Sequence, residues 1–510
     1  MGSRVPLKGL LRVIAGEQMD RLHEGALRVL ETTGLQIRGR FLLQALADAG
    51  CKVDFDKHRA WFKPDLVEKQ IAAQRGRYRM VRSSLWYPFC REMPAGDVAW
   101  PDEWCADFGF ATPVIYDYPS GTYRSPAAQD QAEIIRLGNA LPEVKAICAP
   151  FVCGDFDPRI EIIESSRILL LNTTKPGWVG TSSGREVKYL AEFAALAADH
   201  NQDVLRTMPP IFVHACCTTS PLKLDTRSCE VLQEAFKYRF PVNFAPMPIL
   251  GATAPVTPAG AVVVAAAEIL GCMTAATLID PEVFYYATSI AGEMDMKTTQ
   301  ICYATPAAIL TDAALHQLFR FKYGIVLNVE AGYVEAKCPG IQAAFMKTYR
   351  QMAFGCTVSA SLPVGLLDNG AVFSPAQAML DLDMNRALYA FGQGLEVSDE
   401  TMCLDLISQL EFCEKGAYLE SEHTLRRFRD VLWATRLFDR TYRRPGNILP
   451  HEEDGRILAK ADRAWRELVA AQKPLEVDPR FAAELDRIVE AAKGELLAGG
   501  TPPRAAAEQH

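Results

Sequence analysis

The sequence predicts an α/β protein: a TIM (β/α)8 barrel with an N-terminal α+β cap and a C-terminal helical extension. Apolar runs of strand length alternate with helical segments over roughly 250 residues in the middle of the chain, which suits such a barrel. No GxGxxG motif follows a strand, which argues against a dinucleotide-binding sheet. We expect a cap over residues 1–143, a barrel over 144–416, packed helices over 417–498 and a disordered tail over 499–510.

The N-terminal segment mixes helical and strand patterns. Helical spacing of apolar residues over residues 17–46 predicts two amphipathic helices, and alternation over Cys51–Phe62 predicts a hairpin. Ser125 and Pro126 supply an N-cap and a first-turn proline for a helix that leads into the barrel. Further short strands are expected at Tyr78–Arg82, Phe108–Tyr116 and Gly121–Tyr123.

The central segment is a regular alternation of strands and helices. The eight expected strands are Lys145–Val152, Gly177–Thr181, Pro210–Cys217, Val242–Ala245, Val283–Thr288, Ile325–Val329, Thr357–Leu362 and Gly394–Val397. Several helices between them have recognisable starts, at Ser183 with Glu186, Thr305-Pro306, Ser374-Pro375 and Ser398. Amphipathic helices are then expected at Thr424–Tyr442, Gly455–Ala471 and Arg480–Leu497.

Composition and charge restrict the function. The net charge of −8 and the scattered Lys and Arg residues carry no electrostatic footprint for nucleic acid. The N-terminus has no apolar core of signal-peptide length, and the most apolar window, Ala259–Leu278, contains Glu268 and reads as a core helix rather than a membrane span. Fourteen cysteines without a secretion signal are expected to be reduced, so we predict a cytoplasmic protein.

The stretch Pro241–Gly271 combines a buried strand, a loop rich in Gly, Pro and Thr, and an apolar helix. Small residues between two rigid elements let a ligand approach the backbone, although a plain packed connection is the alternative. In a barrel, the loops after the strands form the site. This loop is therefore a candidate binding segment.

Those loops are poor in catalytic motifs but contain aromatic rings and acids. The candidate substrate-binding residues are Phe244, Tyr286, Tyr303, Glu330, Tyr333, Asp368 and Phe373. Aromatic faces and carboxylates suit a cation without a transferable proton, such as a quaternary ammonium group. Each ring taken singly has the alternative of filling the core.

The one local cluster of metal-binding residue types is His214 with Cys216 and Cys217. If this run is a strand, Cys216 and Cys217 point to opposite faces, so only His214 and Cys216 could converge. Closed zinc sites need three or four protein ligands. A zinc site here is therefore kept as a minor alternative, and no metal is expected.

Several motifs resemble the trimethylamine methyltransferase (MttB-type) family, in its branch without pyrrolysine. They include Gly251–Thr257 with Gly260 and Glu268, Thr219–Leu222, and Thr174–Pro176. Weaker matches are Asp117 with Gly121 and Arg124, Gln342 with Lys347, Gly365–Leu367, His423–Leu425 and Asp439-Arg440. The resemblance runs from about Leu22 to Trp465, nearly the whole chain.

The resemblance implies methyl transfer from a methylated amine or betaine to the Co(I) corrinoid (cobalamin) of a separate carrier protein. It implies contacts to the corrinoid from Ser220, Gly251, Thr253, Thr257, Gln342 and Gly365. An already cationic nitrogen leaves as a neutral amine, so no general base is needed and no catalytic residue is assigned. We also expect a homo-oligomer.

Two other functions remain open from the sequence. A zinc ion at His214 and Cys216 could activate a thiol acceptor on the same barrel. Alternatively, the barrel could bind a methylated ligand, or hold a methyl-transfer complex together, without catalysis.

Overall fold

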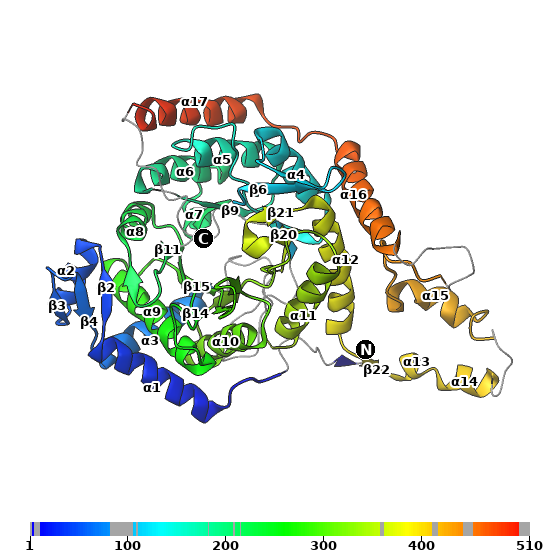
Figure 1. Ribbon diagram of the computed structural model, residues 1–510, viewed down its shortest axis with the longest axis horizontal. Helices are drawn as coiled ribbons and strands as arrows, with labels where there is room; N and C mark the ends of the chain where they lie inside the picture. Colours follow the sequence, from blue (N-terminus) through cyan, green and yellow to red (C-terminus); the bar gives the residue numbers. More distant parts are fainter. Residues whose placement is uncertain are drawn as a thin grey trace.

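We describe the protein from a computed structural model. The structure describes residues 3–4, 11–81, 106–108, 111–181, 183–207, 210–214, 216–357, 362–410, 417–441 and 452–498. The predicted tail over residues 499–510 lies outside these ranges. The chain is an α/β protein in which helices surround a series of parallel strands (Figure 1).

The N-terminal unit is the expected mixture of helices and a small sheet. Its elements are α1 (Gly16–Thr32), β2 (Leu35–Ile37), α2 (Arg40–Asp48), β3 (Lys52–Asp54), β4 (Arg59–Trp61) and α3 (Pro64–Val81). β3 and β4 form the predicted hairpin, and β2 pairs with both β4 and β12 (Lys223–Leu224). α1, α2 and α3 all pack against α9 (Pro258–Ile279), so this unit covers the outer side of that helix.

Eight short parallel strand segments follow one another around the centre of the molecule. In spatial order they are β19 (Leu362–Val364), β5 (Ala106–Phe108), β8 (Val144–Ile147), β9 (Gly177–Gly180), β10 (Ile211–His214) continued by β11 (Cys216–Cys217), β13 (Val242–Ala245), β15 (Tyr285–Ser289) and β18 (Leu327–Val329). The Ile147 amide donates to the Pro176 carbonyl at 2.9 Å, which joins β8 to the strand that follows it. Among the described residues no strand pairing joins β18 to β19, so the series does not close.

The strand order differs from the predicted one at both ends. The first parallel strand is β5, which precedes the expected Lys145–Val152 run and lies within the segment assigned to the cap. The predicted last strand, Gly394–Val397, is wrong: β22 (Glu396–Val397) instead pairs antiparallel with β1 (Ser3–Arg4). In the predicted strand Leu395 is 78 % exposed and Val397 is 55 % exposed, whereas a barrel strand buries its apolar residues.

A helix follows each parallel strand. These helices are α4 (Ala128–Ala140), α5 (Glu161–Asn172), α6 (Gly184–Ala197), α8 (Thr226–Tyr238), α9, α10 (Pro306–Gln317) with the π-helical η1 (Leu318–Tyr323), α11 (Ile341–Thr357) and α12 (Pro375–Gly392), and the short α7 (Gln202–Thr207) follows α6. The capping predictions at Ser183, Thr305 and Ser374 are confirmed; for example, the Thr305 hydroxyl accepts from the Ala308 amide at 3.3 Å. α9 is the one described helix apolar enough to cross a membrane, and 78 % of its apolar window is buried, as expected of a core helix.

Two further small sheets follow the parallel strands. One contains β6 (Val114–Asp117), β7 (Thr122–Arg124), β20 (Leu366–Leu367) and β21 (Val372–Phe373), and the other contains β14 (Ile249–Leu250), β16 (Gly292–Met294) and β17 (Ile301–Cys302). All are formed by chain that leaves the carboxyl ends of parallel strands. The carboxyl ends therefore carry most of the irregular, potentially functional chain.

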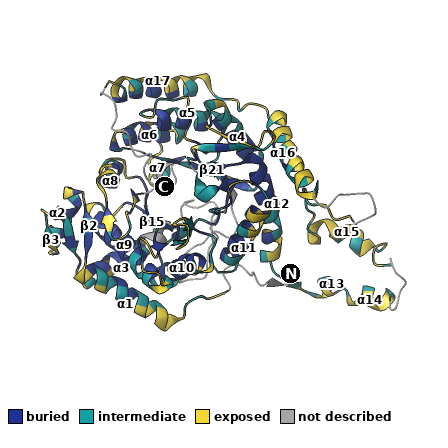
Figure 2. Cartoon of the chain, viewed as in Figure 1, coloured by how far each residue is buried: buried dark blue, intermediate teal, exposed yellow. Residues whose placement is uncertain are grey.

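The C-terminal helices divide into two groups. α16 (Glu453–Ala471) packs on α12 and α4, and α17 (Pro479–Leu496) packs on α5 and α6. α13 (Asp399–Met402), α14 (Leu404–Leu410) and α15 (Glu422–Val431) project away from the body and are largely exposed (Figures 1 and 2). The predicted helix over Thr424–Tyr442 is shorter than expected, because α15 ends at Val431.

Candidate functional site

The two faces of the parallel strands can be told apart at β15. The Tyr285 hydroxyl donates to the carbonyls of Ala276 and Asp280 in and just after α9, at 2.9 and 2.8 Å, so Tyr285 faces the helices. Side chains alternate along a strand, so Tyr286 and Thr288 face the opposite way, toward the centre of the strand series. The register places Asn243 beside Tyr286, and the Asn243 amide donates to the Thr288 hydroxyl at 2.9 Å.

Glu330 is an acid at the end of this inner face. It follows β18 directly, and the Asn328 side chain donates to it at 3.4 Å. Burial raises the pKa of the Tyr286 and Tyr333 hydroxyls, and the neighbouring charge of Glu330 raises both further. Because one carboxylate acts on both phenols, Glu330 lies near both the Tyr286 ring of β15 and the Tyr333 ring of the loop after β18.

Tyr303 completes this group from the loop after β17. Its ring meets the Tyr333 ring edge-on, with centroids 5.6 Å apart. Burial raises the pKa of Tyr303 to about 12, so its phenol, like the other two, stays uncharged at neutral pH. We call Tyr286, Tyr303, Glu330 and Tyr333 the carboxylate–tyrosine cluster. The structure thus brings together four of the seven predicted substrate-binding residues.

The other three predicted substrate-binding residues lie elsewhere. Phe244 is fully buried and stacks on Tyr285, with centroids 6.2 Å apart, so it faces the helices rather than the inner face. Phe373 is fully buried against Phe108 and Phe151 in a second core. Asp368 is partly exposed and forms an ion pair with Lys337 at the rim. The placements of Phe244 and Phe373 do not support a role in ligand contact.

Three of the predicted corrinoid-contacting residues lie together on an exposed turn after β14. Gly251 has a φ of +84°, and the Thr253 hydroxyl accepts from the Ile249 amide at 3.0 Å, which closes the turn. Thr257 is the N-cap position of α9. The nearby side chains of Val256 and Met296 are 66 % and 68 % exposed. This turn offers a surface of small and apolar groups to an incoming partner.

The remaining three have local structural roles. The Ser220 hydroxyl donates at 2.9 Å to Glu268, a buried acid of α9 that also accepts from the Leu222 amide, and burial raises the pKa of Glu268. Gln342 is exposed and donates to the sulfur of Met346 at 3.7 Å. Gly365 has a φ of +81°, and its amide donates to Asp381 at 2.8 Å. None of the three lies on the turn after β14.

Two fully buried ion pairs were not predicted, and the one between Arg350 and Asp312 reaches the cluster. Arg350 of α11 contacts Asp312 of α10 at 3.5 Å and donates to the backbone carbonyls of Tyr303 and Glu330. Lys347 of α11 contacts Asp381 of α12 at 3.0 Å, and Asp381 also holds Gly365. The carboxylate–tyrosine cluster therefore rests on charged groups in the helix layer. A basic residue on a helix gives little sequence signal of burial, because most lie at the surface.

Of the two possible zinc ligands that could converge, the structure describes the side chain of Cys216 only. Burial raises the pKa of the Cys216 thiol, and its sulfur lies 3.8 Å from the Ser228 carbonyl of α8, so Cys216 faces the helices as a thiol. The side chain of His214 lies outside the part of the chain that the structure describes. Within the described residues, no group of three His, Cys, Asp or Glu side chains fits a metal ion.

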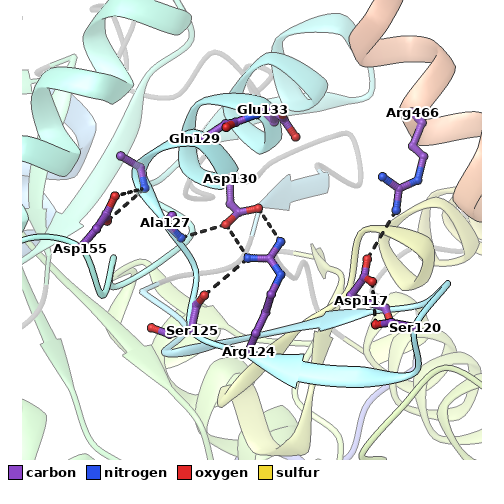
Figure 3. A network of polar contacts seen from close by, with 11 residues as sticks. Asp117, Ser120, Arg124, Ser125, Ala127, Gln129, Asp130, Glu133, Asp155 and Arg466 are labelled. Atoms are coloured by element: carbon purple, nitrogen blue, oxygen red, sulfur yellow. Dashed lines mark hydrogen bonds and ion pairs between the residues drawn. The ribbon is translucent and has the colours of Figure 1, made fainter.

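A separate polar network stabilises the β6–β7 hairpin. Arg124 makes a bidentate ion pair with Asp130 of α4, at 2.6 and 2.7 Å, and Arg466 of α16 approaches Asp117 at 3.5 Å (Figure 3). These groups border a cavity of about 70 Å³ between the hairpin, α4, α12 and α16. The network ties the first strand–helix connection to the C-terminal helices, a structural role.

Comparisons with known proteins identify relatives of the chain. The family model described as trimethylamine methyltransferase (MTTB) matches residues 8–496. The trimethylamine methyltransferase MttB of Desulfitobacterium hafniense is 27 % identical over 491 residues, covering 94 % of this chain and 93 % of that protein. A glycine betaine methyltransferase from the same species is 23 % identical over 500 residues, covering 96 % and 98 %. A solved structure of the hydroxylamine complex of MtmB is 14 % identical, and the match covers 89 % of this chain and 88 % of that chain. The TM-score of this match, 0.44, is too low to support an assignment of fold.

Proposed function

Because the chain belongs to the trimethylamine methyltransferase family, we propose that it moves a methyl group from a quaternary amine to the Co(I) corrinoid of a separate carrier protein. The chain is a methyltransferase. The observation that carries the finer proposal is the carboxylate–tyrosine cluster, in which one acid stands among three uncharged phenol rings. A betaine-like substrate presents one permanent positive charge to such a group.

The energetics of the cluster favour a quaternary nitrogen. A cation on the face of an aromatic ring gains about 0.5–2 kcal/mol, depending on how far water is excluded. A carboxylate some 6 Å from the nitrogen adds about 2–3 kcal/mol at an effective dielectric constant near 20. Because the phenols remain neutral, Glu330 is the one acid of the cluster and matches a single positive charge. A trimethylammonium group has no N–H, so it needs no acceptor aligned with a proton.

We also propose that the parallel strands form a (β/α)8 barrel, with the cluster at its carboxyl-terminal mouth. One close approach supports closure between β18 and β19: a methyl group on Gly332 would lie 2.5 Å from the Pro363 carbonyl oxygen. The chain after β18 therefore touches β19. In a barrel, the loops at the carboxyl ends of the strands form the site, and Glu330 and Tyr333 lie in such a loop.

The turn over residues 251–257 fits the approach of a flat macrocycle carried by a partner. Its residues are small and mostly exposed, and the positive φ of Gly251 allows the chain to turn sharply there. We assign Thr253 and Thr257 to the polar edge of this turn. When bound, the carrier's reduced corrinoid supplies the nucleophile that accepts the methyl group. The neutral amine that leaves needs no proton, so the side chains of this chain act by binding, orienting and excluding water.

The proposal is tested by methyl transfer to a purified carrier. With the carrier in the Co(I) state and a panel of betaines, we expect conversion to the methylated form, followed by its absorbance spectrum. Glu330→Gln should bind the substrate about 30- to 150-fold more weakly, because it loses about 2–3 kcal/mol of charge attraction. Glu24→Gln, at an exposed acid of α1, is the matched control and should behave like the wild type.

Two outcomes of the same assay would contradict the proposal. No transfer from any betaine, with a carrier shown to be active with another enzyme, would rule out the reaction; ligand binding in that case would favour a non-catalytic binding protein. Stoichiometric zinc in protein purified without chelator would favour the zinc alternative. The orientation of Cys216 toward α8 argues against that second outcome.

A further inference from the structure

Trp178 of β9 is an aromatic residue of the parallel strands that was not among the predicted site residues. Along this strand Val179 is buried, whereas its neighbours Trp178 and Gly180 are partly exposed. Val179 belongs to the same apolar core as Leu190 of α6, so the buried side of the strand faces the helices. Because side chains alternate along a strand, the Trp178 ring lies on the inner face, with part of its surface accessible.

The inner positions around Trp178 have small side chains. The hydrogen bond that joins β8 to the Pro176 carbonyl sets Cys148 beside Trp178 in a parallel pair. The next inner positions on the two strands are Ala146 and Gly180. The interior of a (β/α)8 barrel is usually filled by bulky branched side chains. Here the small neighbours leave the indole open to a ligand that enters from the carboxyl ends of the strands.

The wall that contains Trp178 comes close to the carboxylate–tyrosine cluster. β9 and β18 are separated by β10 with β11, β13 and β15, and the helices that follow them, α6 and α11, lie on opposite sides of the ring of helices (Figure 1). Tyr333 extends across this gap. Burial is the main cause of its raised pKa, and the thiols of Cys217 and Cys148 raise that pKa further. Such an effect requires a short distance, so the Tyr333 ring lies near the wall in which Cys148 neighbours Trp178.

We propose that Trp178 is a fourth ring of the substrate site and contacts the cationic nitrogen from the side opposite to Glu330. The inference rests on the proposed function, because it adds a contact to the same quaternary amine. Among aromatic side chains, tryptophan attracts a cation most strongly. An indole has no proton acceptor to offer, and a nitrogen without an N–H needs none. The substrate nitrogen then lies between an indole on one wall and the phenols and carboxylate on the other.

Fluorinated tryptophan at position 178 of the full-length protein tests this contact. Fluorine withdraws electron density from the ring face and changes the size of the ring little, so it weakens the attraction for a cation without opening a cavity. The affinity for glycine betaine, measured by calorimetry, should fall stepwise through the mono-, di- and trifluorinated rings. The same replacements at Trp465, a buried ring of α16, are the matched control and should leave the affinity unchanged.

Substitution by natural residues supplies a second readout. Trp178→Leu should weaken the binding of glycine betaine about five- to thirtyfold, and Trp178→Phe should restore part of the loss. During turnover the KM should rise more than kcat falls, because the ring binds a charge that is already present in the bound substrate. A ring that only shaped the strand wall would instead misplace the substrate and lower kcat.

The outcomes separate this inference from the proposed function. If the wild type bound no quaternary amine, both would be overturned. If it bound glycine betaine and neither fluorination nor Trp178→Leu changed the affinity, the role of Trp178 alone would be overturned and the carboxylate–tyrosine cluster would remain the site. An uncharged carbon analogue of the betaine should show no dependence on fluorination. An equal dependence for the analogue would mean that Trp178 supplies only apolar surface, which would also overturn the inference.

Discussion

At the scale of residues, the proposed site depends on a charge that never touches the ligand. Arg350 is fully buried and holds the backbone carbonyls of Tyr303 and Glu330, two members of the carboxylate–tyrosine cluster. A buried guanidinium requires a partner, and Asp312 provides it while also accepting from Ser289 at 2.7 Å and from the Ala291 amide at 2.9 Å. One ion pair therefore links the loop after β15, the loop after β17 and the end of β18.

Asp312 should make stability depend on pH in a recognisable direction. Burial raises its pKa from 3.8 to about 6, so between pH 4 and pH 6 the folded state holds a proton that the unfolded state has lost. The free energy of unfolding should therefore fall as pH rises through this window, by up to about 3 kcal/mol from this group. Unfolding by denaturant at several pH values checks it, with Asp312→Asn as the comparison. Parallel pH profiles for the two proteins would contradict the assignment.

Residue type and position predicted about half of the candidate site. Glu330 and Tyr333 follow the end of β18, where barrel sites are expected, whereas Tyr286 lies near the start of β15 with its side chain on the inner face. Phe244 and Phe373 were misplaced because a strand such as Val242–Ala245 is buried on both faces, so burial does not tell which face a ring occupies. The buried support from Arg350 could not be predicted, since helix periodicity alone does not separate a buried basic residue from a surface one.

At the scale of elements, capping chemistry was a better guide than apolarity. Ser183, Thr305 and Ser374 mark helix starts because their roles are local and need no tertiary context. The run over residues 394–397 was assigned to the barrel because it contains Leu395 and Val397, but both side chains are exposed and β22 pairs with β1 instead. β5 was missed as a barrel strand because it is only 3 residues long and follows a long irregular segment. An apolar run alone therefore does not show which sheet a strand joins.

Closure between β18 and β19 can be tested at one glycine. A Cβ on Gly332 would lie 2.5 Å from the Pro363 carbonyl oxygen and 2.8 Å from the Pro363 Cβ. Gly332→Ala must therefore push two backbone segments apart, and should lower the free energy of unfolding by about 1–3 kcal/mol. Gly494→Ala is the control: nothing lies within 4 Å of its added methyl group, and alanine in the interior of α17 should stabilise by about 0.5–1 kcal/mol. Thermal or denaturant unfolding of both variants decides, and a neutral Gly332→Ala would remove the support for closure.

At the scale of the whole molecule, the proposal predicts that the protein recognises charge rather than shape. Glycine betaine and 3,3-dimethylbutanoate have nearly the same outline and the same carboxylate, but only the betaine carries a cationic nitrogen. A ligand at a hundred times its dissociation constant stabilises the folded state by about 2.7 kcal/mol, so the betaine should raise the melting temperature and the carbon analogue should not. Glu330→Gln should shrink the rise, because its carboxylate contributes about 2–3 kcal/mol of the attraction. Equal stabilisation by both compounds would mean that binding depends only on apolar volume, which the carboxylate–tyrosine cluster does not explain. If the betaine raised the melting temperature equally in the wild type and in Glu330→Gln, the cation would have to bind at another acid of the chain.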